Sequence, residues 1–213
     1  MQYPNAEKGI RKIFVAEILG LCGAIALTIT VALGLLVEVD DIFAIPAILC
    51  GVAAVVLILL SYIFNIVGIT RASKDEYTFR YALYAVIFGI FFSLLSGFLN
   101  DVFDGNEYAQ RLISLIPDLV NLITMVFIVM GIRNMATALN DPVMESKGRN
   151  ILTIAFVMEM IIFAARAFSG FIPEGSDLAI IELIVVGFAG MLSIVTYILY
   201  LSYLAKARRM LAA

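Results

Sequence analysis

Five ionisable side chains lie inside long apolar stretches of this sequence, and their types could support ion binding, proton transfer or ion pairing. They are Glu17, Asp118, Glu159, Arg166 and Glu182. A charged group at the centre of a membrane-spanning helix costs roughly 2.5–3.5 kcal/mol on insertion scales. Each of the five therefore requires either a partner or a function.

Three of these groups are predicted to lie at similar depth, near the outer side of a membrane. Asp118, with Asn121 one turn further along, Arg166 and Glu182 belong to three different predicted helices. Because a guanidinium stays charged and needs acceptors, Arg166 is predicted to bridge Asp118 and Glu182. This cluster is expected either to line an outward-facing polar cavity or to form an ion pair that only fixes the fold. A third interpretation places Glu182 among the lipid headgroups.

The two remaining carboxylates have different surroundings. Glu159 lies near the centre of its predicted helix, and its neighbours one turn away, Ala155 and Phe163, cannot pair with it. It is therefore expected to be a proton or cation site, or a carboxyl group that is hydrogen-bonded across an interface. Glu17 follows Lys12 near the inner end of the first predicted helix, where local pairing or snorkelling can satisfy it.

The sequence does not contain the residues that several common kinds of catalytic and metal sites require. The chain has no histidine, which removes the usual metal ligand and the usual proton carrier near neutral pH. It has no H-E-x-x-H, G-x-S-x-G or Walker A sequence. Cys22 and Cys50 lie inside predicted helices and are expected to be buried free thiols rather than a disulfide or a metal pair. We therefore expect no enzyme activity, no metal and no cofactor. Because no basic stripe alternates with aromatic residues, we expect no nucleic-acid partner.

The elements that must position these residues are long apolar helices. Hydrophobic residues make up 63% of the chain, well above the typical 45–50% of soluble domains. The segment from Ile42 to Thr70 is 29 residues without a charge, and roughly 20 apolar residues suffice to span a bilayer. The sequence predicts an all-α, polytopic membrane protein with six transmembrane helices. Their expected ranges are 13–37, 42–70, 80–100, 110–133, 149–171 and 178–204.

Charge patterning predicts the orientation of these helices. With the N-terminus inside, 12 of the 14 basic residues fall in cytoplasmic segments, while the outer loops are acidic. The positive-inside rule therefore predicts a multi-pass protein of the cell membrane with both termini in the cytoplasm. Tyrosines gather near the inner helix ends, as expected for anchoring at a membrane interface. They include Tyr77, Tyr81, Tyr84, Tyr197, Tyr200 and Tyr203.

The predicted loops group the helices into three tandem α-hairpins within a single transmembrane domain, residues 1–213. Outer connections are tight, whereas inner connections are expected to be longer, the longest running from about Arg133 to Arg149. Arg11, Arg80 and Arg149 open the odd-numbered helices and are spaced by 69 residues in both steps. This spacing indicates repeats at 8–75, 77–141 and 146–209, although topology alone would also place a basic residue at each of these starts.

Two stripes of small residues predict close helix contacts, because small side chains let helix backbones approach in lipid. Each stripe recurs every four residues, and the contacts are expected to join hairpins or protomers. The first stripe is Ala16, Gly20, Ala24, Thr28 and Ala32, and the second is Ala85, Gly89, Ser93 and Gly97.

These observations lead to two functional hypotheses. The first is a small membrane transporter or ligand-binding membrane subunit whose polar site uses Asp118, Arg166 and Glu182, with Glu159 as an ion-coupling carboxylate. The alternative is a non-catalytic membrane interaction, assembly or lipid-binding scaffold protein. The expected partners are membrane lipids, a small-molecule or ion substrate, and further copies of the chain or a membrane partner protein. A polar cavity favours the first hypothesis, and charges sealed in a dry interior favour the second.

Overall fold

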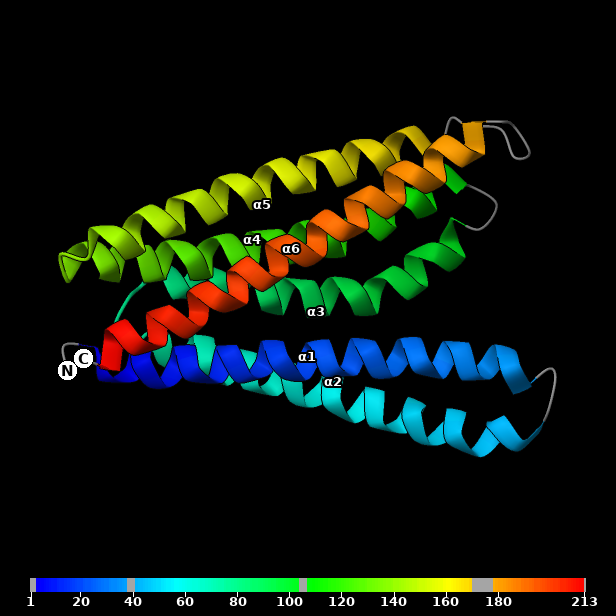
Figure 1. Cartoon of the computed structure of the whole chain (residues 1–213), viewed down its shortest axis with the longest axis horizontal. Helices are drawn as coiled ribbons and strands as arrows, with labels where there is room; N and C mark the ends of the chain where they lie inside the picture. Colours follow the sequence, from blue (N-terminus) through cyan, green and yellow to red (C-terminus); the bar gives the residue numbers. More distant parts are fainter. Residues whose placement is uncertain (1–2, 38–40, 104–106, 170–177, 213) are drawn as a thin grey trace. The chain divides into compact units, whose positions relative to one another are not determined.

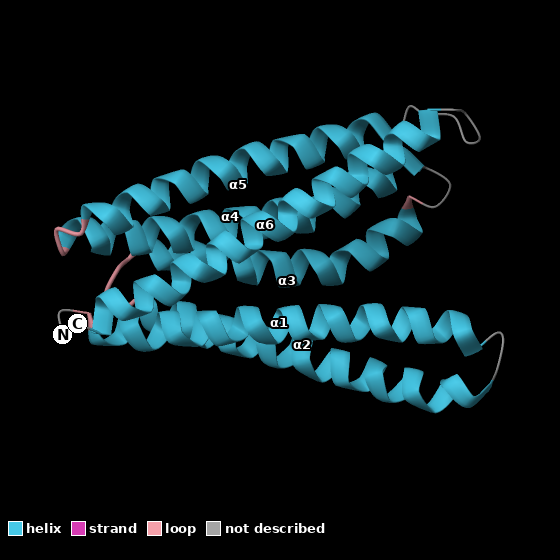
Figure 2. Ribbon diagram, viewed as in Figure 1, coloured by secondary structure: helices cyan, strands magenta, loops and turns pink. Residues whose placement is uncertain are grey.

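The computed structural model describes residues 3–37, 41–103, 107–169 and 178–212. Within these ranges the chain is helical, with short turns and no strand (Figure 2). This confirms the predicted all-α fold with six helices. The helices are α1 (Pro4–Val37), α2 (Ala44–Ala72), α3 (Thr78–Val102), α4 (Glu107–Ala138), α5 (Pro142–Ser169) and α6 (Leu178–Ala212), and the short 3₁₀ helix η1 (Asp41–Phe43) precedes α2.

Five of the helices are long and apolar enough to cross a membrane. The candidate spans are Pro4–Val37, Asp41–Ala72, Thr78–Leu99, Leu115–Ala138 and Gly190–Ala212. Within the part of the chain that the structure describes, α5 is not among them. Large apolar side chains are exposed on these helices, up to 78% for Leu94. Such extensive apolar exposure is typical of helices whose surroundings are lipid or other apolar helices.

The chain divides into two compact units. Unit 1 comprises residues 1–75 with 211–213, and unit 2 comprises residues 76–210. Unit 1 contains α1 and α2, and unit 2 contains α3, α4, α5 and nearly all of α6. That residues 1–213 form a single transmembrane domain stays a prediction, because it depends on how the two units pack together.

Unit 1 is an antiparallel helical hairpin, with α1 and α2 side by side along their length (Figure 1). The two backbones almost touch where Gly9 crosses Gly68. A β-carbon on Gly9 would lie 2.6 Å from the carbonyl oxygen of Gly68, and one on Gly68 would lie 2.9 Å from the nitrogen of Ile13. Only glycine permits this approach, so the helix separation in this hairpin is set at a pair of residues that belongs to neither predicted stripe.

The predicted stripe on α1 was expected to join hairpins or protomers, but two of its members lie in the seam within this hairpin. Ala16 is buried, and Gly20 faces Ser61, but Ala24, Thr28 and Ala32 are exposed. The seam alternates steps of three and four residues instead of repeating every four, which is the spacing of antiparallel and parallel coiled helices alike. Its members on α1 are Ala6, Gly9, Ile13, Ala16, Gly20, Gly23 and Thr30, and on α2 they are Gly51, Ala54, Ile58, Ser61, Gly68 and Ala72.

In unit 2, α4 packs against both α3 and α5. Two glycines of this unit, Gly131 and Gly89, lie against side chains of the neighbouring helix and not against its backbone. A β-carbon on Gly131 of α4 would lie 2.6 Å from the Phe79 ring of α3, and one on Gly89 would lie 2.8 Å from Val120. The α1–α2 and α3–α4 pairs are thus packed hairpins, whereas the third hairpin and the repeat stay predictions.

The expected long inner loop from Arg133 to Arg149 is wrong. The helix α4 continues to Ala138 and α5 starts at Pro142, so the connection is a tight turn. Asn140 adopts φ 56°, and the nitrogens of Asn140 and Asp141 donate to the carbonyls of Thr137 and Ala136. This is a Schellman ending. The Asp141 carboxylate then accepts hydrogen bonds from the nitrogens of Val143 and Met144, which caps α5.

Other helices also extend beyond their predicted ends. The helix α1 begins at Pro4 rather than at residue 13, and α6 continues to Ala212 rather than ending at 204. Arg11 and Arg149 consequently lie about two turns inside their helices, whereas Arg80 lies in the first turn of α3. Hydropathy identifies only the apolar part of a helix, which is the part that can lie in lipid. The polar ends of these helices were therefore not predicted.

Candidate functional site

The predicted charge cluster falls partly outside the described residues. Asp118 is half-buried on α4, directly after Pro117, which lies within the helix. Asn121, one turn further along, is exposed. Arg166 and Glu182 lie in α5 and α6, but their side chains are outside the described part of the chain. The bridging of Asp118 and Glu182 by Arg166 therefore stays a prediction.

The other predicted polar positions lie on separate helices. Glu159 is half-buried on α5, one turn from the buried Ala155, and Glu17 is half-buried on α1. Both cysteines are free, but Cys22 is exposed on the chain, so its expected burial is wrong. Among the described residues, no three His, Cys, Asp or Glu side chains come together as a metal site.

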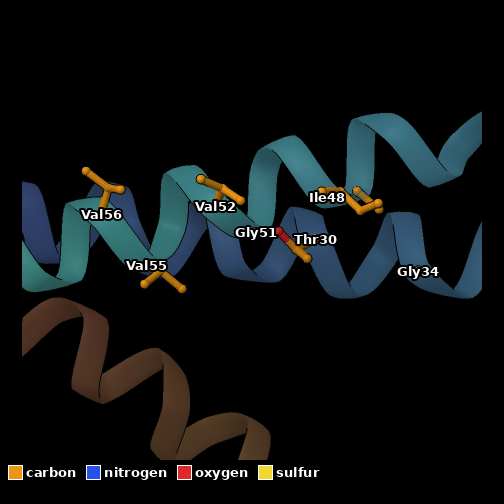
Figure 3. Close-up of a pocket in the computed structure, with 8 residues that line it drawn as sticks. Thr30, Gly34, Ile48, Gly51, Val52, Val55 and Val56 are labelled. Atoms are coloured by element: carbon orange, nitrogen blue, oxygen red, sulfur yellow. The ribbon is translucent and has the colours of Figure 1, made fainter.

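One cavity in unit 1 is a shallow, open apolar groove between α1 and α2. Its volume is about 470 Å³, and its lining residues come from the C-terminal half of α1 and the N-terminal half of α2 (Figure 3). We call this surface the hairpin groove. It is lined by Thr30, Gly34, Ala47, Ile48, Gly51, Val52, Val55 and Val56.

Small residues create the hairpin groove. No atom lies within 4 Å of the position that a β-carbon on Gly34 would take, so this stretch of α1 has open space beside it. Gly51 faces Thr30 across the seam, and its β-carbon would lie 3.3 Å from the Thr30 methyl group (Figure 3). The Thr30 hydroxyl donates to the carbonyl oxygen of Ala26 at 2.9 Å. The one hydroxyl in the lining is thus satisfied within its own helix, and the groove presents only apolar surface to an occupant.

The opposite end of unit 1 is closed by polar contacts. The Asp75 carboxylate accepts hydrogen bonds from the backbone nitrogens of Asn5 and Ala6 and from the Asn5 side chain, each at 2.8 Å. Asp75 therefore acts as an N-terminal cap supplied from the far end of the hairpin. About two turns further along α1, the Lys12 ammonium lies 5.6 Å from the centre of the Phe64 ring, within cation–π range.

Glu76, the residue after Asp75, belongs to a different hydrogen-bond network, which lies in unit 2. Glu76 accepts hydrogen bonds from the Thr78 hydroxyl at 2.6 Å and from the Asn134 amide at 3.2 Å. The same Asn134 amide donates to Thr78 at 3.1 Å, which ties the start of α3 to α4. The boundary between the two units thus falls between two adjacent acidic residues, each bound within its own unit.

Comparison with protein-family models, with curated proteins and with solved structures finds no match for this chain. The hairpin groove was not predicted from the sequence, although Gly34, Ala47 and Gly51 are small residues on either side of the connection between the first two helices. The cap at Asp75 was not predicted either, because a cap that comes from 70 residues away has no local signature.

Proposed function

We propose that this protein is a multi-pass membrane protein that acts as a non-catalytic interaction subunit and binds a transmembrane helix of a partner in the hairpin groove. Its location is supported by the five helices that are long and apolar enough to cross a membrane. Both termini face the cytoplasm in this proposal, as the distribution of basic residues indicates.

The apolar, small-residue lining of the hairpin groove carries this proposal. Gly34, Ala47 and Gly51 present almost no side chain, so a neighbouring helix can approach the α1 and α2 backbones closely. Ile48, Val52 and Val55 supply apolar surface for van der Waals contact with it. A polar solute would find no exposed hydrogen-bonding group in this lining, which argues against an aqueous transport site at this position.

Site-specific photocrosslinking in native membranes tests the proposed binding. A benzophenone amino acid at Ile48, in the groove, is expected to give one discrete protein adduct. The same probe at Ile25, an exposed position of α1 outside the groove lining, is the matched control and should give none. Gly34→Leu should remove the Ile48 adduct by filling the groove. Identical diffuse lipid adducts at both positions would refute the proposal, and an adduct of twice the chain mass would identify a second copy as the partner.

Cysteine labelling tests the orientation. In a background without Cys22 and Cys50, single cysteines at Asn106 and Gly175 should react with an impermeant reagent added from outside the cell. Cysteines at Ser73 and Ser146 should react only after the membrane is permeabilised. Protection at Asn106 together with external reaction at Ser146 would reverse the proposed topology.

A transporter or ligand-binding subunit is the second candidate, and Pro117 favours it. Proline removes one backbone hydrogen bond and disturbs the preceding turn of α4, just where Asp118 follows. Interrupted spanning helices commonly line transporter sites. In this candidate, Asp118, Asn121, Arg166 and Glu182 bind the substrate, and Glu159 couples an ion. Asp118→Asn should then abolish substrate-dependent uptake in proteoliposomes and leave the groove crosslink unchanged, whereas unchanged uptake would eliminate the candidate.

A further inference from the structure

The ends of α4, α5 and α6 that are predicted to face the cytoplasm meet in unit 2. The Tyr203 hydroxyl of α6 lies over Gly148 of α5, where a β-carbon would be 2.6 Å from it. The same β-carbon position is 3.5 Å from Cβ of Arg133 on α4. On the other side of α4, Phe79 at the start of α3 covers Gly131. These contacts gather the basic residues that flank them at one end of unit 2.

This end of unit 2 carries far more basic than acidic residues. Between Glu76 and Arg80, between Arg133 and Asn150, and after Tyr203, the sequence has seven basic and three acidic residues. Arg133 and Lys147 are half-buried, and the other five basic residues are exposed. We call these seven the inner basic cluster. It consists of Arg80, Arg133, Lys147, Arg149, Lys206, Arg208 and Arg209.

The three acidic residues already have structural partners. Glu76 accepts from Thr78 and Asn134, and Asp141 caps α5. Glu145 lies 3.7 Å from Arg133, as an ion pair between their side chains. Among the described residues, therefore, these carboxylates neutralise little of the inner basic cluster, and most of its charge faces outward.

The Tyr203 hydroxyl is a second, independent observation at this place. Tyr203 is only 1% exposed, and within the described part of the chain its hydroxyl has no hydrogen-bond partner. A buried hydroxyl without an acceptor is costly, and here the hydroxyl and Cβ of Arg133 both lie beside Gly148. An anionic oxygen entering beside Arg133 could accept from both the guanidinium and the hydroxyl.

We propose that the inner basic cluster binds the phosphate groups of anionic lipids in the cytoplasmic leaflet, with Arg133 and Tyr203 at its most buried point. The inference rests on the proposed membrane location. A lipid fits better than an acidic protein segment, because the cluster adjoins the ends of apolar helices at the depth of the headgroups. The exposed Tyr77, Tyr81 and Tyr84 near the start of α3 are suited to the same interfacial layer.

Lipid titration of the purified full-length chain tests this proposal. Binding to phosphatidylserine-containing micelles is compared with binding to phosphatidylcholine micelles at low and high salt. The unmodified protein should prefer phosphatidylserine, and the preference should weaken with salt because mobile ions screen exposed charges. One basic side chain near an anionic surface strengthens binding by roughly fivefold, so the triple variant Lys206→Gln, Arg208→Gln, Arg209→Gln should lose about tenfold or more.

A matched variant separates the cluster from general charge. Lys8→Gln, Arg11→Gln, Arg71→Gln removes the same charge from exposed positions of unit 1 and should keep most of the preference. Tyr203→Phe should reduce the preference without altering phosphatidylcholine binding, an effect that a purely structural role would not produce. Equal losses in both triple variants, or no preference in the unmodified protein, would overturn the proposal. Carbonate extraction of membranes scores the membrane location separately, since a protein that resists extraction but shows no preference fails only the lipid inference.

Discussion

The tightest glycine contact of unit 1 is made with backbone atoms and those of unit 2 with side chains, and this difference indicates how firmly each contact is held. In unit 1, Gly9 and Gly68 bring two backbones together, so the atoms they admit cannot move without shifting a helix. In unit 2, Gly131, Gly89 and Gly148 lie beneath the side chains of Phe79, Val120 and Tyr203, which can rotate or shift by small amounts. The Gly9–Gly68 crossing of unit 1 should therefore tolerate added volume poorly, whereas the three glycine contacts of unit 2 should absorb part of it.

The largest effect is expected at the backbone crossing. Gly68→Leu should destabilise the protein by about 3 kcal/mol, because its β-carbon would meet the Gly9 carbonyl and the Ile13 backbone below 3 Å. Chemical unfolding in detergent, followed by circular dichroism, measures the loss. An unfolding free energy equal to that of the unmodified protein would show that α1 and α2 do not cross at these glycines.

A smaller loss is expected for the same substitution over a side chain. Gly89→Leu should cost about 2 kcal/mol, because its β-carbon meets a Val120 methyl group at 2.8 Å and not a backbone atom. The double variant Gly89→Leu, Val120→Ala should recover part of the loss by returning volume to the contact. Additive losses in this double-mutant cycle would contradict direct packing of Gly89 on Val120.

The cap of α1 should contribute less than either packing contact. Asp75→Ala removes the acceptor of three hydrogen bonds and should cost about 1 kcal/mol, since water can replace it at an exposed helix end. Hydrogen exchange should increase at the first turn of α1 and stay unchanged in α5, which has its own cap at Asp141. Unchanged exchange at Asn5 and Ala6 would mean that Asp75 does not cap α1.

The smallest effect is expected at Gly97, on the same predicted stripe as Gly89. No atom lies within 4 Å of its β-carbon position, so Gly97→Leu should change stability by less than about 0.5 kcal/mol. This variant is also the matched control for Gly68→Leu, because both place leucine in a spanning helix. A large loss at Gly97 would show that this end of the stripe packs against another helix or a second copy.

The sequence predicted helices well, but it did not predict which positions meet. Composition and charge-free length were sufficient for the helices, because lipid requires them. Ala16 and Gly20 lie in the seam within one hairpin, although their stripe was predicted to join hairpins or protomers. Ala24, Thr28 and Ala32 lie outside this seam, because a seam between coiled helices follows an average period of 3.5 residues. The Asn140-Asp141-Pro142 segment has the residues of a helix end followed by an N-cap and a first-turn proline. This signal was overlooked because a long loop was expected there.

The candidate sites were less predictable than the fold. Whether Asp118, Arg166 and Glu182 meet depends on the rotation and depth of three helices. Hydropathy does not fix the rotation or the depth of a helix to better than about one turn. The hairpin groove exists because Gly34 and Gly51 have no side chains. The same pattern of small residues would also arise where a neighbouring helix packs closely, so the sequence does not distinguish a groove from a helix contact. The orphan hydroxyl of Tyr203 is visible only when its neighbours are known, since an interfacial tyrosine would satisfy the same sequence pattern.

The cap at Asp75 also places a constraint on biosynthesis. The ribosome releases Asn5 long before Asp75, so the start of α1 emerges without the carboxylate that later accepts its backbone nitrogens. The α1–α2 hairpin can receive this cap only when Asp75 has been translated, and Glu76 then begins the contacts of unit 2. Two consecutive codons thus mark the moment at which one hairpin can be capped and the next can begin to assemble.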